Sequence, residues 1–220
     1  MSSDEVRKKS GGIFFFFSLL ALLLVSTWNV RFLIGVLATW GLKFPLILMV
    51  AAAIGWVLAK FLIRAHLSTF IHELKHAVLS NLVGNRAKGM KIRRDTGYFK
   101  YEYTEETARY NAFISLAPYC LPLFTAPTLG LASWLIDERL VCTAVVGIAL
   151  GFDLQTGWRD VGAHQTDFID LRGGYFIGLI YVCAATVTLV SIVVAWAAGG
   201  WGGVGQLVAE YFRTVRMLVG

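Results

Sequence analysis

The sequence predicts an all-α polytopic membrane protein with five to six membrane helices, a small β-hairpin and a C-terminal amphipathic helix. The first observation behind this fold class is composition: 57% of the 220 residues are hydrophobic and 15% are charged, against about 25% charged residues in a soluble domain. The second is that long runs lack charge altogether, at residues 10–30, 44–59, 110–136, 141–152 and 173–209. Since a membrane-crossing helix needs about 20 mostly apolar residues, three of these runs are long enough alone.

This composition excludes an ordinary soluble enzyme, a disordered tail and a disulfide-rich secreted module. The net charge of +6 does not indicate nucleic-acid binding, because seven of the 20 basic residues lie in one segment, Arg86 to Arg109, together with four acids. A basic loop between apolar runs is typical of the cytoplasmic side, where it faces anionic lipid. Cys120, Cys142 and Cys183 all lie in apolar runs, so we interpret them as small buried hydrophobic residues.

Residues 1–43 are expected to hold an N-terminal membrane helix, at residues 13–28, and a shorter interfacial segment. The apolar run follows a basic start, as in a signal peptide, but no small-residue cleavage site follows it, so we expect a retained helix with a cytoplasmic N-terminus. Residues 44–84 would form a helix about 60 Å long if unbroken, twice the thickness of a bilayer core of about 30 Å. A break near residues 60–66 is therefore predicted.

The remaining elements follow from turn signals and apolar runs. Asp95-Thr96-Gly97 and the alternating residues after it predict a β-hairpin at 91–103. Helices are expected over residues 110–135, 139–157 and 173–198, the first with three prolines, which membrane helices tolerate. We thus divide the rest of the chain into a core at 44–198 and a segment at 199–220 whose apolar residues fall on one helix face, as in a helix lying on the membrane surface.

The segment His72-Glu73-Leu74-Lys75-His76 contains the most informative motif, HExxH. On a helix, residues i and i+4 share a face, so both imidazoles can bind one zinc ion. Zinc lowers the pKa of a bound water, and Glu73 beside it can act as the general base. Ionisable groups in an apolar helix are expensive and mark a functional site by default. We expect Lys75, inside the motif, to point away from the metal.

A catalytic zinc ion needs a third protein ligand, and two later aspartates are the main candidates. Asp153 ends an apolar run and is the preferred ligand, with Asp167 as the alternative, although Thr166-Asp167 could also be a helix cap. Asp160 and Asp170 are weaker candidates. His66 and His164 are more typical of interfacial histidines than of ligands.

These residues resemble the site-2 protease class of intramembrane zinc metalloproteases, and most closely its short, site-2-protease-like branch. The shared pattern, over about residues 45–195, is His72-Glu73-x-x-His76-Ala77, then Gly84, Gly97 in the hairpin, Leu116-Ala117-Pro118-Tyr119, and Asp153 fourteen residues before Thr166-Asp167. Pro118 stands where the family usually has Gly, Thr166-Asp167-Phe168 replaces Ser-Asp-Ala, and the Asn-x-x-Pro-x-x-Leu-Asp-Gly string of better-studied members is absent.

The resemblance implies a zinc metalloendopeptidase that hydrolyses a peptide bond in or near a membrane-helix substrate, with a hairpin that holds the substrate in extended form. We expect an integral protein of the bacterial inner (cytoplasmic) membrane, with the lipid bilayer and a membrane-protein substrate as partners and no nucleic acid. The alternative is a non-catalytic membrane subunit that retains the fold and docks in a larger complex. A transporter is a weaker hypothesis, because an ion path does not need two histidines one turn apart.

Overall fold

The computed structural model describes residues 13, 15–22, 24–93, 97–162, 165–169, 171 and 173–219. The polar start at 1–11, the turn residues Asp95 and Thr96, and the weaker candidates His164 and Asp170 lie outside these ranges.

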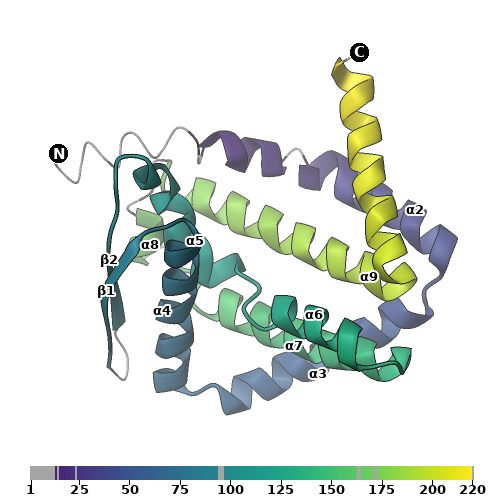
Figure 1. Ribbon diagram of the computed structural model, residues 1–220, viewed down its shortest axis with the longest axis horizontal. Coiled ribbons are helices and arrows are strands. Elements are labelled where there is room, and N and C mark those ends of the chain that lie inside the picture. Colours follow the sequence, from purple (N-terminus) through teal and green to yellow (C-terminus); the bar gives the residue numbers. More distant parts are fainter. Residues whose placement is uncertain are drawn as a thin grey trace.

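The first half of the chain folds into η1 (Leu24–Asn29), α2 (Val30–Trp40), α3 (Lys43–Leu62) and α4 (Ala65–Leu82). The predicted break in the 44–84 run is confirmed: α3 ends before Ile63, whose backbone is extended. After the break, α4 runs crosswise to α3, α7 and α9 (Figure 1). Gly84 ends α4, because its φ of +86° lies in the left-handed region that favours glycine.

The hairpin is confirmed and is longer at its start than predicted. β1 (Arg86–Ile92) pairs antiparallel with β2 (Gly97–Glu102), from Arg86 opposite Glu102 to Ile92 opposite Gly97. Inward-facing residues of β2 are half-buried and alternate with exposed ones. The hairpin lies against the outer side of α4 (Figure 1).

The prediction of one helix over residues 110–135 is wrong. The segment forms η2 (Thr107–Tyr110), α5 (Asn111–Cys120) and α6 (Thr125–Leu135), and the chain bends by 65° at the break between α5 and α6. The physical reason is Pro122, because a residue that precedes proline avoids helical backbone angles. Leu121 accordingly adopts an extended conformation.

The second half contains α7 (Arg139–Arg159), α8 (Thr166–Ile169) and α9 (Gly174–Val219). Gly200, with φ of 61°, divides α9 into two helices at the place where the sequence separates the last membrane helix from the C-terminal segment. In that segment Leu207 is buried against α2, but Phe212 and Val215 on the same predicted face are exposed. The second half of α9 projects away from the bundle (Figure 1).

The core lies where α3, α7 and α9 pack together, around Leu48, Val146, Leu150 and Val193. Within the described residues, three helices are long and apolar enough to cross a membrane, namely α3, α7 and α9, or four spans if the bent α5–α6 pair is counted as one. The predicted five to six spans are therefore not supported. Two predicted spans are missing from this set. The N-terminal stretch at 13–28 is helical at residues 13 and 15–22 and continues as η1, but it contains no helix long enough to count as a span among the described residues. α4, although 18 residues long, contains Glu73, Lys75 and three histidines.

Candidate metal centre

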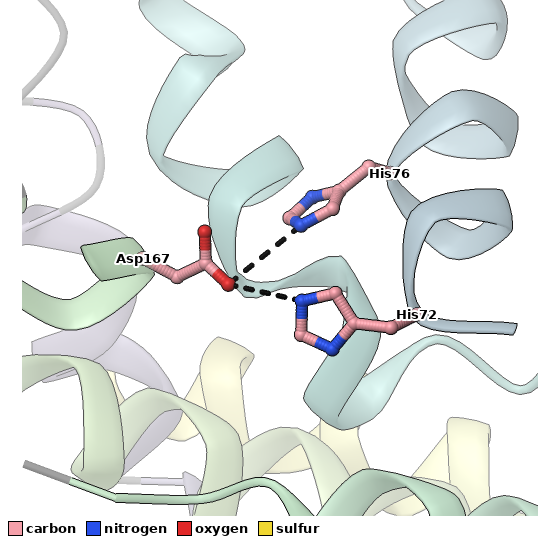
Figure 2. Close-up of side chains that lie close together, drawn as sticks. All are labelled: His72, His76 and Asp167. Carbon is pink, nitrogen blue, oxygen red and sulfur yellow. Dashed lines mark hydrogen bonds and ion pairs between the residues drawn. The ribbon is translucent and has the colours of Figure 1, made fainter. Parts of the chain in front are cut away.

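Three side chains from two elements meet beside α4. His72 and His76, one helical turn apart, both point from α4 toward Asp167 of α8 (Figure 2). The Nε2 atoms of His72 and His76 lie 3.2 Å and 3.6 Å from Oδ2 of Asp167. The potential ligand atoms of the three residues lie within 4.8 Å of one another, and no other such group was found in the part of the chain that the structure describes.

Packing of the residue after Asp167 fixes this carboxylate. α8 is only four residues long, but Phe168 is fully buried, with its ring centroid 4.7 Å from that of Tyr119 and 5.3 Å from that of Tyr175. The Tyr119 hydroxyl donates a hydrogen bond of 3.0 Å to Oδ2 of Asp167. The short helix is therefore anchored on one side and presents its acid on the other.

The outer nitrogens of both imidazoles have partners. Nδ1 of His76 donates to the backbone carbonyl of Ile114 at 2.7 Å, which turns Nε2 toward Asp167. Nδ1 of His72 lies 3.6 Å from Oδ2 of Asp160. Partners of this kind orient metal-binding histidines in proteins, and a carboxylate partner also raises their basicity.

The two ion pairs across the site set its charge. Burial lowers the pKa of His72, but its contacts with Asp160 and Asp167 outweigh burial and raise the pKa to about 9. Burial also raises the pKa of Asp167, but its contacts with His72 and His76 outweigh burial and hold the pKa well below its usual range. The carboxylate of Asp167 is therefore ionised, as a metal ligand must be.

Glu73 lies on the hairpin side of the histidines and is 7% exposed. The backbone N–H of Phe99 in β2 donates a hydrogen bond to its carboxylate. Burial raises the pKa of Glu73, and its electrostatic interaction with His76 and His72 offsets part of this effect. A carboxylate with a raised pKa beside a metal-type group of ligands is suited to accept a proton.

A cavity of about 540 Å³ opens in front of these side chains. It lies between α4 and β2, and its other lining residues come from α5, from the end of α7 and from α8. Its lining includes His72, Glu73, His76, Tyr98, Phe99, Tyr101, Ser115, Arg159, Asp160 and Asp167. The exposed edge of β2 therefore runs along the same cavity as the candidate metal ligands.

Asp153, the preferred third ligand from the sequence, lies in a different set of contacts. Its Oδ2 accepts hydrogen bonds from the backbone N–H groups of Phe124 and Thr125, at 2.9 and 2.7 Å, and from the Thr125 hydroxyl at 2.8 Å. Its Oδ1 lies 3.4 Å from Nζ of Lys75. The structure thus brings the alternative, Asp167, together with the two histidines and separates Asp153 from them.

The other sequence candidates also have definite positions. Asp160 lies behind His72 as its partner, and His66 is exposed and outside the group. Sequence reasoning did not find the Ile114 carbonyl or the Phe99 N–H, because backbone groups have no residue signature. Tyr119 appeared only within a motif, and no spacing rule links it to Asp167.

The ligand set fits zinc. Two imidazole nitrogens and one carboxylate oxygen, together with an open side that faces a cavity, match the three protein ligands and free position of a catalytic zinc site. The fit rests on the donor types, their convergence within 4.8 Å and the partners behind the histidines.

Fold and site together define an integral membrane protein with an HExxH-type candidate metal centre. The sequence model of the Peptidase M50B-like family matches residues 46–196. The chain belongs to this family, which supports the resemblance to site-2-protease-like proteins. No curated protein and no solved structure matches the chain.

Proposed function

We propose that this chain is an intramembrane zinc metalloprotease that hydrolyses a peptide bond in or near a membrane-helix substrate. The observation that carries the proposal is the convergence of His72, His76 and Asp167 with Glu73 beside them, at a cavity edged by a strand. Family membership supports a peptidase of the site-2 protease type. The bacterial inner membrane is the proposed location.

In this proposal His72, His76 and Asp167 hold the zinc ion. We favour Asp167 over Asp153 because both carboxylate oxygens of Asp153 already face donors from α4 and α6. When bound, zinc polarises the scissile carbonyl and makes water acidic enough to attack it near neutral pH. Glu73 takes the proton from the attacking water and delivers it to the leaving amide nitrogen, and the Phe99 N–H orients the carboxylate for both transfers.

The substrate proposed is a membrane protein whose helix unwinds locally before cleavage. Unwinding exposes backbone N–H and C=O groups, which are costly in a bilayer unless they find partners. The edge of β2 along the cavity supports this proposal, because an extended segment can pair with an exposed strand edge. The hairpin would then hold the substrate across the zinc ligands.

The test begins with zinc content and cleavage in the purified full-length chain. We expect one bound zinc in the wild type, loss of that zinc in His72→Ala and Asp167→Asn, and retained stoichiometric binding in Asp153→Asn at saturating zinc. Glu73→Gln should keep zinc and lose at least about 100-fold in cleavage of a panel of single-span membrane segments, because a positioned base contributes about 10²–10⁴-fold.

Zinc content measured by mass spectrometry separates the outcomes. A carefully handled wild type without zinc would exclude the metal site. A zinc-binding wild type that cleaves no faster than Glu73→Gln would instead favour the alternative, a non-catalytic membrane subunit. Zinc lost in Asp153→Asn but kept in Asp167→Asn would reverse the ligand assignment.

A further inference from the structure

Lys75, in the variable interior of the HExxH motif, is one of the most deeply buried side chains in the described structure. It is 1% exposed, and its ammonium group donates to the Pro118 carbonyl and the Thr156 hydroxyl, both at 3.3 Å. Its Nζ lies 3.4 Å from Oδ1 of Asp153. None of these contacts involves His72, His76 or Asp167.

Asp153 extends the same network to a fourth helix. The carboxylate is buried, and its second oxygen accepts three hydrogen bonds from Phe124 and Thr125, at the N-terminal end of α6. A carboxylate at a helix N-terminus is favourable because unpaired N–H groups point toward it. The ion pair between Lys75 and Asp153 therefore connects α4 to α7. Lys75 also connects α4 to α5, and Asp153 connects α7 to α6.

The position of Lys75 on α4 gives this network a consequence for the site. At about 100° per residue, Glu73 and Lys75 lie about 80° to either side of the direction shared by His72 and His76. Glu73 contacts the hairpin on one side, and Lys75 contacts α5 and α7 on the other. A rotation of α4 in either direction would break one of these sets of contacts and turn both histidines away from Asp167.

Stability alone does not account for a buried ion pair at this position. Desolvation of two charges often cancels their attraction, so an apolar pair of similar volume is commonly as stable. What an ion pair adds is a defined orientation, because its hydrogen bonds are lost on rotation, whereas apolar contacts adapt.

The geometry points to Lys75 and Asp153 as positioning residues that fix the rotation of α4, so that the imidazoles of His72 and His76 converge with Asp167 on one metal ion. This inference rests on the proposed zinc site and adds two residues to it. Neither side chain touches the metal. Asp153 thus contributes to the site through the motif helix and not as a ligand.

The decisive variant removes the ion pair without leaving a buried charge. In Lys75→Met/Asp153→Asn the Asn carbonyl can still accept hydrogen bonds from the N-terminus of α6. We expect this double variant to fold, with a melting temperature close to that of wild type, and to bind zinc about tenfold more weakly in chelator competition. Loss of an indirect partner commonly lowers metal affinity by about 10–100-fold. We also expect a changed d–d absorption spectrum of the Co²⁺-loaded protein, which reports ligand geometry.

The matched control is Lys88→Met/Glu102→Gln, which removes an exposed ion pair of 2.8 Å in the hairpin and should leave zinc affinity and the Co²⁺ spectrum unchanged. Wild-type affinity and spectrum in the Lys75/Asp153 double variant would overturn the inference. If that variant does not fold, Thr156→Val, which removes one partner of Lys75, is measured in its place: about threefold weaker zinc binding supports the inference, and unchanged binding overturns it.

The controls also separate this inference from the proposed function. A wild-type chain that binds no zinc contradicts both. A wild-type chain that binds zinc, with unchanged binding in the variants, contradicts only the positioning role and leaves the metalloprotease proposal in place.

Discussion

The catalytic assignment of Glu73 depends on how closely the hairpin approaches its carboxylate. Gly97, the first residue of β2, makes this approach possible, because a Cβ at that position would lie 2.9 Å from Oε1 of Glu73 and 2.8 Å from Cγ2 of Thr69. Real Cβ atoms do not come so near without a shift of one partner. The absence of a side chain at Gly97 thus lets the Phe99 N–H reach Glu73.

Gly97→Ala should therefore displace Glu73 or the strand without touching the metal ligands. We expect stoichiometric zinc and at least about tenfold slower cleavage of a single-span membrane segment, since a misplacement of about 1 Å can cost about 100-fold in rate. Gly89→Ala in β1 is the control, because a Cβ there meets no atom within 4 Å. An unchanged rate in Gly97→Ala, with Glu73→Gln inactive, would contradict the role given to Gly97.

At the level of residues, the sequence predicted what one turn of helix determines. The spacing within HExxH is enough to place His72, Glu73 and His76 on adjoining faces of α4. The sequence could not decide whether Asp153 or Asp167 is the third ligand, because the position of each carboxylate depends on how distant segments of the chain pack. Asp153 finds its donors at residues 75, 124 and 125, and only the folded chain brings these positions together.

At the level of elements, the geometry of the site depends on the shortest helix. α8 has four residues, too few to be stable alone, and it is held by Phe168 in a pocket formed with Tyr119 and Val182. Gly178 of α9 makes room for this ring, since a Cβ there would lie 2.6 Å from Cδ1 of Phe168. The position of Asp167, the proposed third ligand, thus depends on an apolar contact made by the next residue.

Phe168→Ala should loosen α8 and with it Asp167. We expect a lower melting temperature, because removal of a buried Phe commonly costs about 3–5 kcal/mol, and zinc binding weakened by at least about tenfold in chelator competition. Ile169→Ala changes the next residue, which is 59% exposed, and should leave both quantities near wild type. Equal zinc affinity in the two variants would show that α8 does not need its anchor.

The elements that the sequence predicted well have strong local signals. Gly84 and Gly200 mark the end of α4 and the break in α9, and the break between α3 and α4 followed from length alone. The α5–α6 bend was missed because membrane helices often tolerate proline. Whether a proline such as Pro122 kinks or breaks a helix depends on whether the backbone groups that lose their helical hydrogen bonds find other partners. Here Asp153 accepts hydrogen bonds from the backbone N–H groups at the N-terminus of α6.

For the whole molecule, composition was sufficient to predict a helical membrane protein, because lipid leaves backbone groups few other ways to be satisfied. The number of spans could not be predicted from composition alone, because α4 packs against the hairpin, α5 and α7 and does not need an apolar surface all round. Polar residues that would oppose insertion of a lone helix are tolerated inside this assembly. Membership of the Peptidase M50B-like family over residues 46–196 agrees with a core formed by these packed helices.

The packing of α3 on α7 is the main contact of that core and relies on small residues. A Cβ on Gly151 would lie 2.5 Å from the Trp56 backbone nitrogen and 2.8 Å from the Gly55 carbonyl carbon, so glycine at this position lets the two helix backbones approach closely. Gly151→Val should therefore force α7, with Asp153 on it, away from α3. We expect the free energy of unfolding in detergent to fall by about 1–3 kcal/mol. Trp fluorescence recorded during an SDS titration measures this change. Gly35→Ala, where a Cβ on α2 meets no atom within 4 Å, should unfold at the wild-type SDS concentration. A Gly151→Val protein as stable as that control would show that the candidate metal centre does not depend on a close contact between α3 and α7.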